Sequence, residues 1–137
     1  MNQSYLGDQL SLFRNKRTLK NKTYWFARNY EKFLPHNNNA SILEVGPGFG
    51  ELMDYLVLEK KYSRYQAIDN SKDVVDYCNS KHDKKAIHIE SLSQFFGDNG
   101  SVKYDAILMF HVLEHIQKEN VIEILSLLRN ALAEGGV

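Results

Sequence analysis

Hydrophobic and polar residues alternate in blocks along residues 41–137. Short apolar runs, each followed by a polar or glycine-containing turn, predict four strands: Ser41–Val45, Tyr65–Ile68, Ala86–Ile89 and Asp105–Phe110. The segments between and after them have helical spacing and predict helices or a short turn: Glu51–Lys60, Ser71–Ser80, Ser91–Phe96 and Lys118–Ala133. Strands that alternate with helices form a parallel sheet with helices on its faces, so the pattern predicts an α/β fold.

The first forty residues have a different pattern. Their apolar side chains recur at roughly helical spacing, at Leu10, Phe13, Leu19, Tyr24, Trp25, Tyr30, Phe33 and Leu34. Pro35 and the asparagines at 37–39 end this segment. We therefore predict a helical extension or lid over residues 1–40 and a core over residues 41–137. In the last helix of that core we expect one inward stripe: Val121, Ile122, Leu125, Leu128 and Leu132.

Composition excludes several classes of protein. The 137 residues are 43% hydrophobic and 12% aromatic, which suits one folded domain and not a disordered chain. The sequence has no apolar run of the ~18 residues that a membrane helix needs. With a single cysteine and no signal-peptide pattern, we expect a cytoplasmic protein without a disulfide or a membrane partner.

Charge is unevenly distributed although the net charge is zero. Residues 1–40 carry seven Lys or Arg against two acids, and residues 41–137 carry ten against fifteen. The basic segment either meets an anionic substrate or is an ordinary solvated helix face. We expect no nucleic-acid partner.

A glycine-rich turn and a later acid supply the candidate chemistry. Glycines at 46, 48 and 50 follow the first predicted strand, and Asp69 ends the second. Such a turn lets the backbone approach a ligand closely, and an acid at that place can bind both hydroxyls of a ribose. A dinucleotide fingerprint would need glycine at position 51, which is Glu51, and no phosphate-loop lysine is present. Glu44 would repel a pyrophosphate but suits the cationic end of S-adenosylmethionine.

The same segments resemble the class I S-adenosylmethionine-dependent methyltransferases. ILEVGPGFG at 42–50 is similar to their motif I, YQAIDN at 65–70 to their second strand with its ribose-binding acid, and YDAILMFHVLEHI at 104–116 to their fourth strand and the segment after it. LLRNALAEGGV at 127–137 is similar to the helix that leads to their next turn. The resemblance implies a Rossmann-like fold and S-adenosylmethionine as the cofactor.

The resemblance also implies roles for individual residues. The methionine part would lie on the glycine turn, the ribose on Asp69, the adenine beside Asn70 and the turn at 90–92, and the sulfonium near the end of the fourth strand. The implied cofactor-binding residues are Glu44, Gly46, Pro47, Gly48, Gly50, Asp69, Asn70, Ser91, Leu92, Phe110 and His111. For a hydroxyl acceptor, His111 is the candidate general base because an imidazole titrates near neutral pH.

Relatives in this family continue into further strands, which are missing after Gly135, Gly136 and Val137. We therefore expect an open, apolar edge on the fourth strand and a homodimer through that edge. The predicted function is methyl transfer to a small-molecule or saccharide acceptor. The alternative is an inactive cofactor-binding module that serves as an interaction partner.

The stretch His111–His115 leaves two metal hypotheses open. Its H-x-x-E-H form would suit a zinc hydrolase if it lay on a helix and found a third ligand. It is also similar to an E-x-x-E-H stretch that binds a divalent ion in some RNA methyltransferases, with His111 in place of the first glutamate. Otherwise Glu114 and His115 cap a helix, and we predict no metal site.

Overall fold

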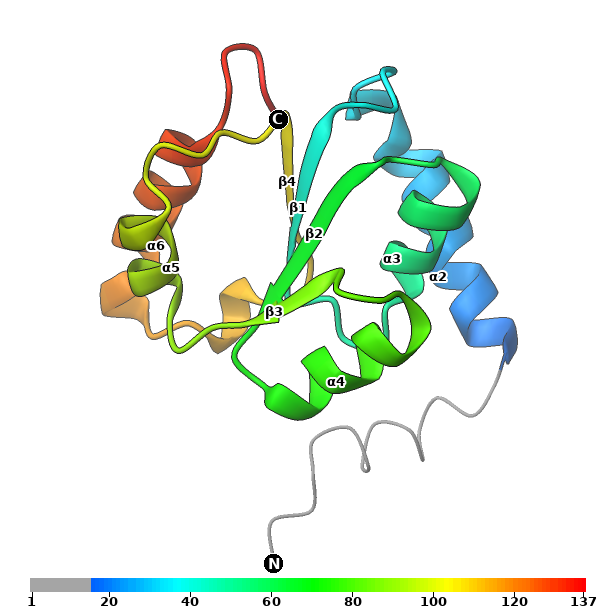
Figure 1. Cartoon of the computed structure of the whole chain (residues 1–137), viewed down its shortest axis with the longest axis horizontal. Helices are drawn as coiled ribbons and strands as arrows, with labels where there is room; N and C mark the ends of the chain where they lie inside the picture. Colours follow the sequence, from blue (N-terminus) through cyan, green and yellow to red (C-terminus); the bar gives the residue numbers. More distant parts are fainter. Residues whose placement is uncertain (1–15) are drawn as a thin grey trace, which may run out of the picture.

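The computed structural model describes residues 16–137, and Figure 1 shows one parallel sheet between two layers of helices. The sheet has the strand order β3-β2-β1-β4. Its strands are β1 (Ser41–Val45), β2 (Arg64–Asp69), β3 (Ala86–His88) and β4 (Ala106–Met109). The α-helices are α2 (Lys16–Asn29), α3 (Glu51–Asp54), α4 (Lys72–Lys81), α5 (Leu92–Asp98) and α6 (Lys118–Ala131). Shorter turns of helix are η1 (Glu31–Phe33), η2 (Tyr55–Glu59) and η3 (Leu113–His115). The predicted Rossmann-like α/β fold is confirmed.

Side chains of β1 alternate between two apolar cores because successive residues of a strand face opposite sides of the sheet. Ile42 packs with Phe26, Met53 and Val74 on the side of α2, α3 and α4. On the opposite face, the core is formed with α5 and α6 by Leu43, Val45, Ile68, Phe95, Phe96 and Ala131. All five residues of β1 are buried, as expected for the central strand of a covered parallel sheet.

Two of the predicted helices differ in detail from the helices of the structure. The predicted helix over 51–60 is α-helical only to Asp54 and then widens into the π-helical turn η2. The predicted inward stripe of α6 is partly wrong. Ile122 is 74% exposed and Leu125 is exposed as well, whereas Ile124 and Ala131 are buried. The helix is rotated so that the face carrying 124 and 131 meets the sheet.

The outer edge of β4 is partly paired within the chain. The backbone N of Val137 donates to the Asp105 carbonyl at 3.1 Å, and the N of Ile107 donates to the Val137 carbonyl at 2.7 Å. Tyr104 also forms an isolated parallel bridge with Leu132. The homodimer through this edge therefore stays a prediction.

Candidate functional site

A cavity of about 410 Å³ opens at the carboxyl end of the sheet. The predicted site residues that line it are Gly46, Gly48, Asp69, Asn70, Ser91, Leu92 and His111. The other lining residues are not among the predicted site residues: Val45, Ile68, Ser71, Val74, Ile89, Val112, His115 and Ile116. The volume is within the ~300–1,000 Å³ typical of small-molecule sites. Parallel sheets bind ligands at this end, so the cavity lies where the topology predicts a site.

One wall of the cavity is bare backbone. Residues 46, 48 and 50 all have positive φ, between 55° and 73°, which only glycine adopts without strain. A Cβ added to Gly48 would meet nothing within 4 Å, so its backbone borders open space. The backbone of this loop can therefore contact a ligand directly.

The neighbouring strand β2 ends at Asp69, which also lines the cavity. Asp69 Oδ1 accepts a hydrogen bond from the Ser71 backbone N at 2.7 Å, which fixes the carboxylate beside the first turn of α4. Burial raises the pKa of Asp69 above its ordinary value, and the bonds from backbone N–H groups together with nearby His88 oppose that shift. A carboxylate has about four acceptor positions, so Asp69 keeps capacity for hydroxyl donors.

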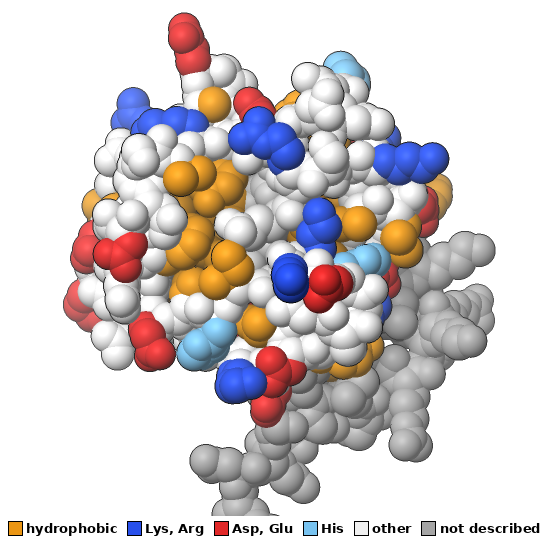
Figure 2. Space-filling model, viewed as in Figure 1, with side chains coloured by type: hydrophobic (Ala, Val, Ile, Leu, Met, Phe, Trp, Pro, Cys, Tyr) orange, Lys and Arg blue, Asp and Glu red, His pale blue; other side chains and the backbone are white. Residues whose placement is uncertain are grey.

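Apolar side chains from β2, α4, the loop after β3 and the start of α5 form an apolar part of the lining, the apolar floor. They include Ile68, Val74, Ile89 and Leu92. Figure 2 shows hydrophobic side chains gathered on the face between the α5 and α6 helices and the sheet. A hollow with apolar sides and one polar acid suits a flat, apolar ring attached to a polyhydroxyl group.

Gly46 is covered by a residue that follows β4. Val112 Cγ2 lies 2.5 Å from the position that a Cβ on Gly46 would occupy. The loop after β4 therefore packs directly onto the glycine loop, and it places His111, Val112, His115 and Ile116 along the cavity.

His111 stands at the rim of the cavity in an unusual conformation. Its φ is +56°, in the left-handed region that non-glycine residues avoid. Its side chain is 84% exposed, and its Nδ1 lies 3.4 Å from Glu114 Oε1. Strain of this kind is concentrated at functional sites, so the conformation singles out His111 among the rim residues.

Four predicted cofactor residues do not line the cavity: Glu44, Pro47, Gly50 and Phe110. Glu44 points away because its neighbour Val45 faces the cavity and side chains alternate along a strand. It is buried on the side of α3 and α4 and accepts a hydrogen bond from the Tyr65 hydroxyl. Burial raises the pKa of Glu44 to about 7.

A family model described as "Methyltransferase domain" matches residues 16–137. The chain belongs to this methyltransferase family. That membership confirms the predicted family, and the cofactor of the family is S-adenosylmethionine. No curated protein matches the chain in sequence.

Solved structures of methyltransferases share the fold of this methyltransferase domain. The sugar N-methyltransferase KedS8 from Streptoalloteichus sp. ATCC 53650 is 16% identical with a TM-score of 0.65, over 91% of this chain and 49% of that one. DesVI from Streptomyces venezuelae is 15% identical with a TM-score of 0.68, over 99% and 55% of the two chains. The plantazolicin methyltransferase BpumL, in complex with a monoazolic desmethylPZN analogue and SAH, is 23% identical with a TM-score of 0.60, over 93% of this chain and 49% of that one. The chain thus spans about half the length of these structures.

The methyltransferase domain also gathers aromatic rings around Phe110, the residue before His111. Phe110 packs against α2 and the turn after it, with ring centroids 5.2 Å from Tyr30, 5.7 Å from Phe26 and 6.4 Å from Trp25. Trp25 is 49% exposed. None of these four rings lines the cavity, and the cluster is joined to it through the backbone between Phe110 and His111.

The structure does not favour the zinc hypothesis. Residues 113–115 form only the short 3-10 turn η3, so the i and i+4 spacing of an α-helix is not present there. Among residues 16–137, no group of three or more His, Cys, Asp or Glu side chains could hold a metal ion. In this same range no helix is long and apolar enough to cross a membrane.

Proposed function

We propose that this domain binds S-adenosylmethionine in the 410 Å³ cavity and transfers its methyl group to a small-molecule or saccharide acceptor. The observation that carries the proposal is that one cavity is lined both by the side-chain-free residues Gly46 and Gly48 and by Asp69. Asp69 would accept hydrogen bonds from the ribose hydroxyls. The apolar floor would hold the adenine, and the glycine loop would receive the methionine part.

The cavity fits this cofactor better than a dinucleotide. The lining includes one acid, Asp69, and no lysine or arginine that could neutralise a pyrophosphate. S-adenosylmethionine carries no phosphate, and when bound it supplies an electrophilic methyl group on a sulfonium. Positioning the acceptor in line with that methyl group supplies much of the rate enhancement, which asks little chemistry of the protein.

His111 would act as the general base when the acceptor is a hydroxyl. The imidazole of His111 would accept the hydroxyl proton of the acceptor, and bound S-adenosylmethionine would supply the methyl group to the acceptor oxygen. Glu114, 3.4 Å from Nδ1, would stabilise the imidazolium that results. The strained backbone at His111 would hold the ring at the rim.

The aromatic cluster suits an acceptor with a ring. Trp25 and Tyr30 present partly exposed rings beside Phe110, and such rings bind the apolar face of a sugar or an aromatic molecule. KedS8, which has the same fold, is a sugar N-methyltransferase. We therefore place the acceptor between this cluster and His111.

Calorimetry with S-adenosylhomocysteine, followed by a methyl-transfer assay over sugar and aromatic acceptors, tests the proposal. We expect saturable binding and turnover with at least one acceptor. His111→Asn, which tolerates the left-handed backbone, should keep the affinity for S-adenosylhomocysteine and lower kcat about 100-fold. Binding without turnover on any acceptor would favour the inactive module, and no binding would contradict both functions.

A further inference from the structure

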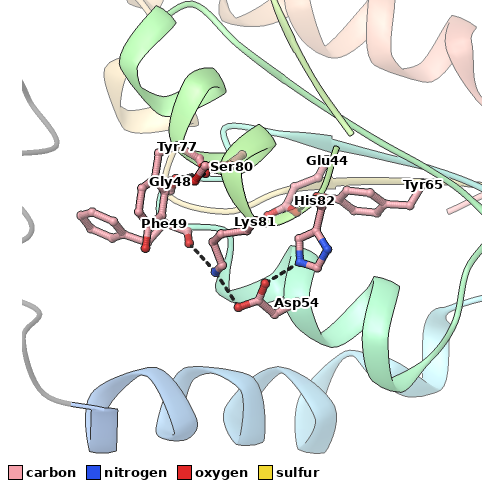
Figure 3. A network of polar contacts seen from close by, with 10 residues as sticks. Glu44, Gly48, Phe49, Asp54, Tyr65, Tyr77, Ser80, Lys81 and His82 are labelled. Atoms are coloured by element: carbon pink, nitrogen blue, oxygen red, sulfur yellow. Dashed lines mark hydrogen bonds and ion pairs between the residues drawn. The ribbon is translucent and has the colours of Figure 1, made fainter. Parts of the chain in front are cut away.

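Residues at the C-terminal end of α4 contact the glycine loop at 46–50, and Figure 3 shows these contacts. Lys81 Nζ donates to the Phe49 carbonyl oxygen at 3.2 Å and to Asp54 Oδ2 at 2.5 Å. His82 Nε2 lies 2.7 Å from Asp54 Oδ1. The carboxylate of Asp54, the last residue of α3, thus binds the side chains of Lys81, the last residue of α4, and of His82, its C-terminal cap.

Two further contacts connect α4 to the same loop. Cys78 Sγ lies 3.6 Å from the Gly48 carbonyl oxygen. Burial raises the pKa of the Cys78 thiol to about 12, so the thiol keeps its proton and can donate it. The rings of Phe49 and Tyr77 meet edge to face with centroids 6.0 Å apart. Residues 48 and 49 are therefore both bound by the inner face of α4.

The loop needs this support because its own conformation is entropically costly. Three glycines with positive φ within five residues lose more conformational freedom on ordering than other residues would. Backbone carbonyl groups of the loop are held by partners outside the loop and by local bonds, such as the 2.9 Å bond from the Gly50 N to the Pro47 carbonyl. Lys81 supplies the charged donor, which makes the stronger kind of hydrogen bond.

The other end of α4 lies beside Asp69. Ser71 caps α4 through its side chain, and its backbone N donates to Asp69. Ser71 and Val74 line the cavity directly. One ten-residue helix therefore contacts Asp69 through its N-terminal cap and the glycine loop through its last turn.

We propose that Lys81 is a positioning residue for the cofactor, which holds the glycine loop in its binding conformation through the Phe49 carbonyl, with its own ammonium group oriented by Asp54. Lys81 does not line the cavity, so it would act on the cofactor only through the loop. Because α4 and its cap contact both the loop and Asp69, the Lys81 contact would let α4 set the distance between them. The inference rests on the proposed binding of S-adenosylmethionine at this loop.

The test compares Lys81→Met with wild type, with Lys81→Arg as the conservative variant. Lys72→Met is the matched control, because Lys72 lies on the same helix in an exposed ion pair with Asp76 at 2.6 Å. We expect Lys81→Met to weaken S-adenosylhomocysteine binding about tenfold in calorimetry, which corresponds to the loss of one charged hydrogen bond. Lys81→Arg should restore most of the affinity, and Lys72→Met should leave it unchanged.

Hydrogen–deuterium exchange without ligand separates this inference from the proposed function. Lys81→Met should speed exchange at the amides of residues 48–50 while the amides of β1 keep wild-type protection. If wild-type protein does not bind S-adenosylhomocysteine, the proposed function fails, and the exchange data still decide whether Lys81 orders the loop. Unchanged loop exchange, or an effect of Lys72→Met equal to that of Lys81→Met, would overturn the inference. Asp54→Asn keeps the volume of the side chain and should also speed exchange at the amides of residues 48–50. This variant replaces Lys81→Met in the test if Lys81→Met does not fold.

Discussion

Val112 lies so close to Gly46 that its Cγ2 occupies the space a side chain at position 46 would need, 2.5 Å from the Cβ position. Gly46 also has a φ of +73°. An alanine there would meet both a steric clash and a strained backbone. We expect Gly46→Ala to lower the free energy of unfolding by about 2–4 kcal/mol and to abolish binding of S-adenosylhomocysteine. Chemical denaturation and calorimetry would measure the two effects.

Gly135 provides a control for the backbone contribution. Its φ is +72°, but a Cβ there would meet nothing within 4 Å. Gly135→Ala should therefore cost only about 1–2 kcal/mol, the strain of a left-handed alanine. The double variant Gly46→Ala/Val112→Ala should regain the part of the free energy of unfolding that Gly46→Ala loses to the steric clash. Equal losses of stability for Gly46→Ala and Gly135→Ala would mean that Val112 does not restrict the glycine loop.

Removing the Asp69 carboxylate should weaken cofactor binding without unfolding the domain. Asp69→Ala removes the acceptor of the ribose hydroxyls, and we expect a loss of ~1.5–3 kcal/mol of binding free energy for S-adenosylhomocysteine. Asp73→Ala is the matched control because Asp73 is an exposed acid in the first turn of α4 and lies outside the cavity. Isothermal titration calorimetry of both variants measures the effect. An Asp69→Ala variant with wild-type affinity would show that the ribose is bound elsewhere.

Trp25 is the only tryptophan of the chain, so its fluorescence reports directly on the aromatic cluster. If an acceptor ring stacks on this side chain, acceptor binding should change the emission. We expect Trp25→Ala to raise the KM for the acceptor about tenfold and to leave the affinity for S-adenosylhomocysteine unchanged. Steady-state kinetics with the acceptor found in the screen would test this.

Phe33→Ala is the matched control for Trp25→Ala. Phe33 is 57% exposed on the same part of the chain, and its ring contacts the Lys32 ammonium and none of the rings packed against Phe110. It should not change the KM for the acceptor. A rise in KM for Phe33→Ala as large as that for Trp25→Ala would place the acceptor away from the cluster.

The sequence predicted the parts of the site that depend on the order of elements. Apolar runs located the four strands, and a glycine-rich turn after β1 and an acid after β2 must meet at the carboxyl edge of a parallel sheet. Asp69, Gly46 and Gly48 accordingly face one cavity. This reasoning needs only strand order and direction, which short-range patterns reveal.

The remainder depends on side-chain direction and on contacts between distant segments. Its place before the glycines predicts that Glu44 binds the cofactor, although the alternation of side chains along β1 already puts Glu44 and Val45 on different faces of the sheet. The contact of Val112 with Gly46 joins residues from two strand ends, and nothing in either segment alone encodes it. Similarly, the rotation of α6 is set by its packing on the sheet, which leaves Ile122 exposed despite its helical spacing.

Glu44 should make the stability of the domain depend on pH. Its carboxyl is buried with the Tyr65 hydroxyl as its hydrogen-bond donor, and burial raises its pKa from 4.5 to about 7. A group with a raised folded-state pKa favours the native state at low pH, and this contribution is lost as pH rises from 4.5 through 7. Relative to Glu44→Gln, which cannot ionise, wild type should therefore lose on the order of 3 kcal/mol between pH 4.5 and pH 8. Urea denaturation of both proteins across this range measures the difference. The Tyr65 hydroxyl favours the charged carboxylate of Glu44, so Tyr65→Phe should make the loss of stability with rising pH larger. A constant difference at every pH would mean that Glu44 is already ionised in the folded protein below pH 5.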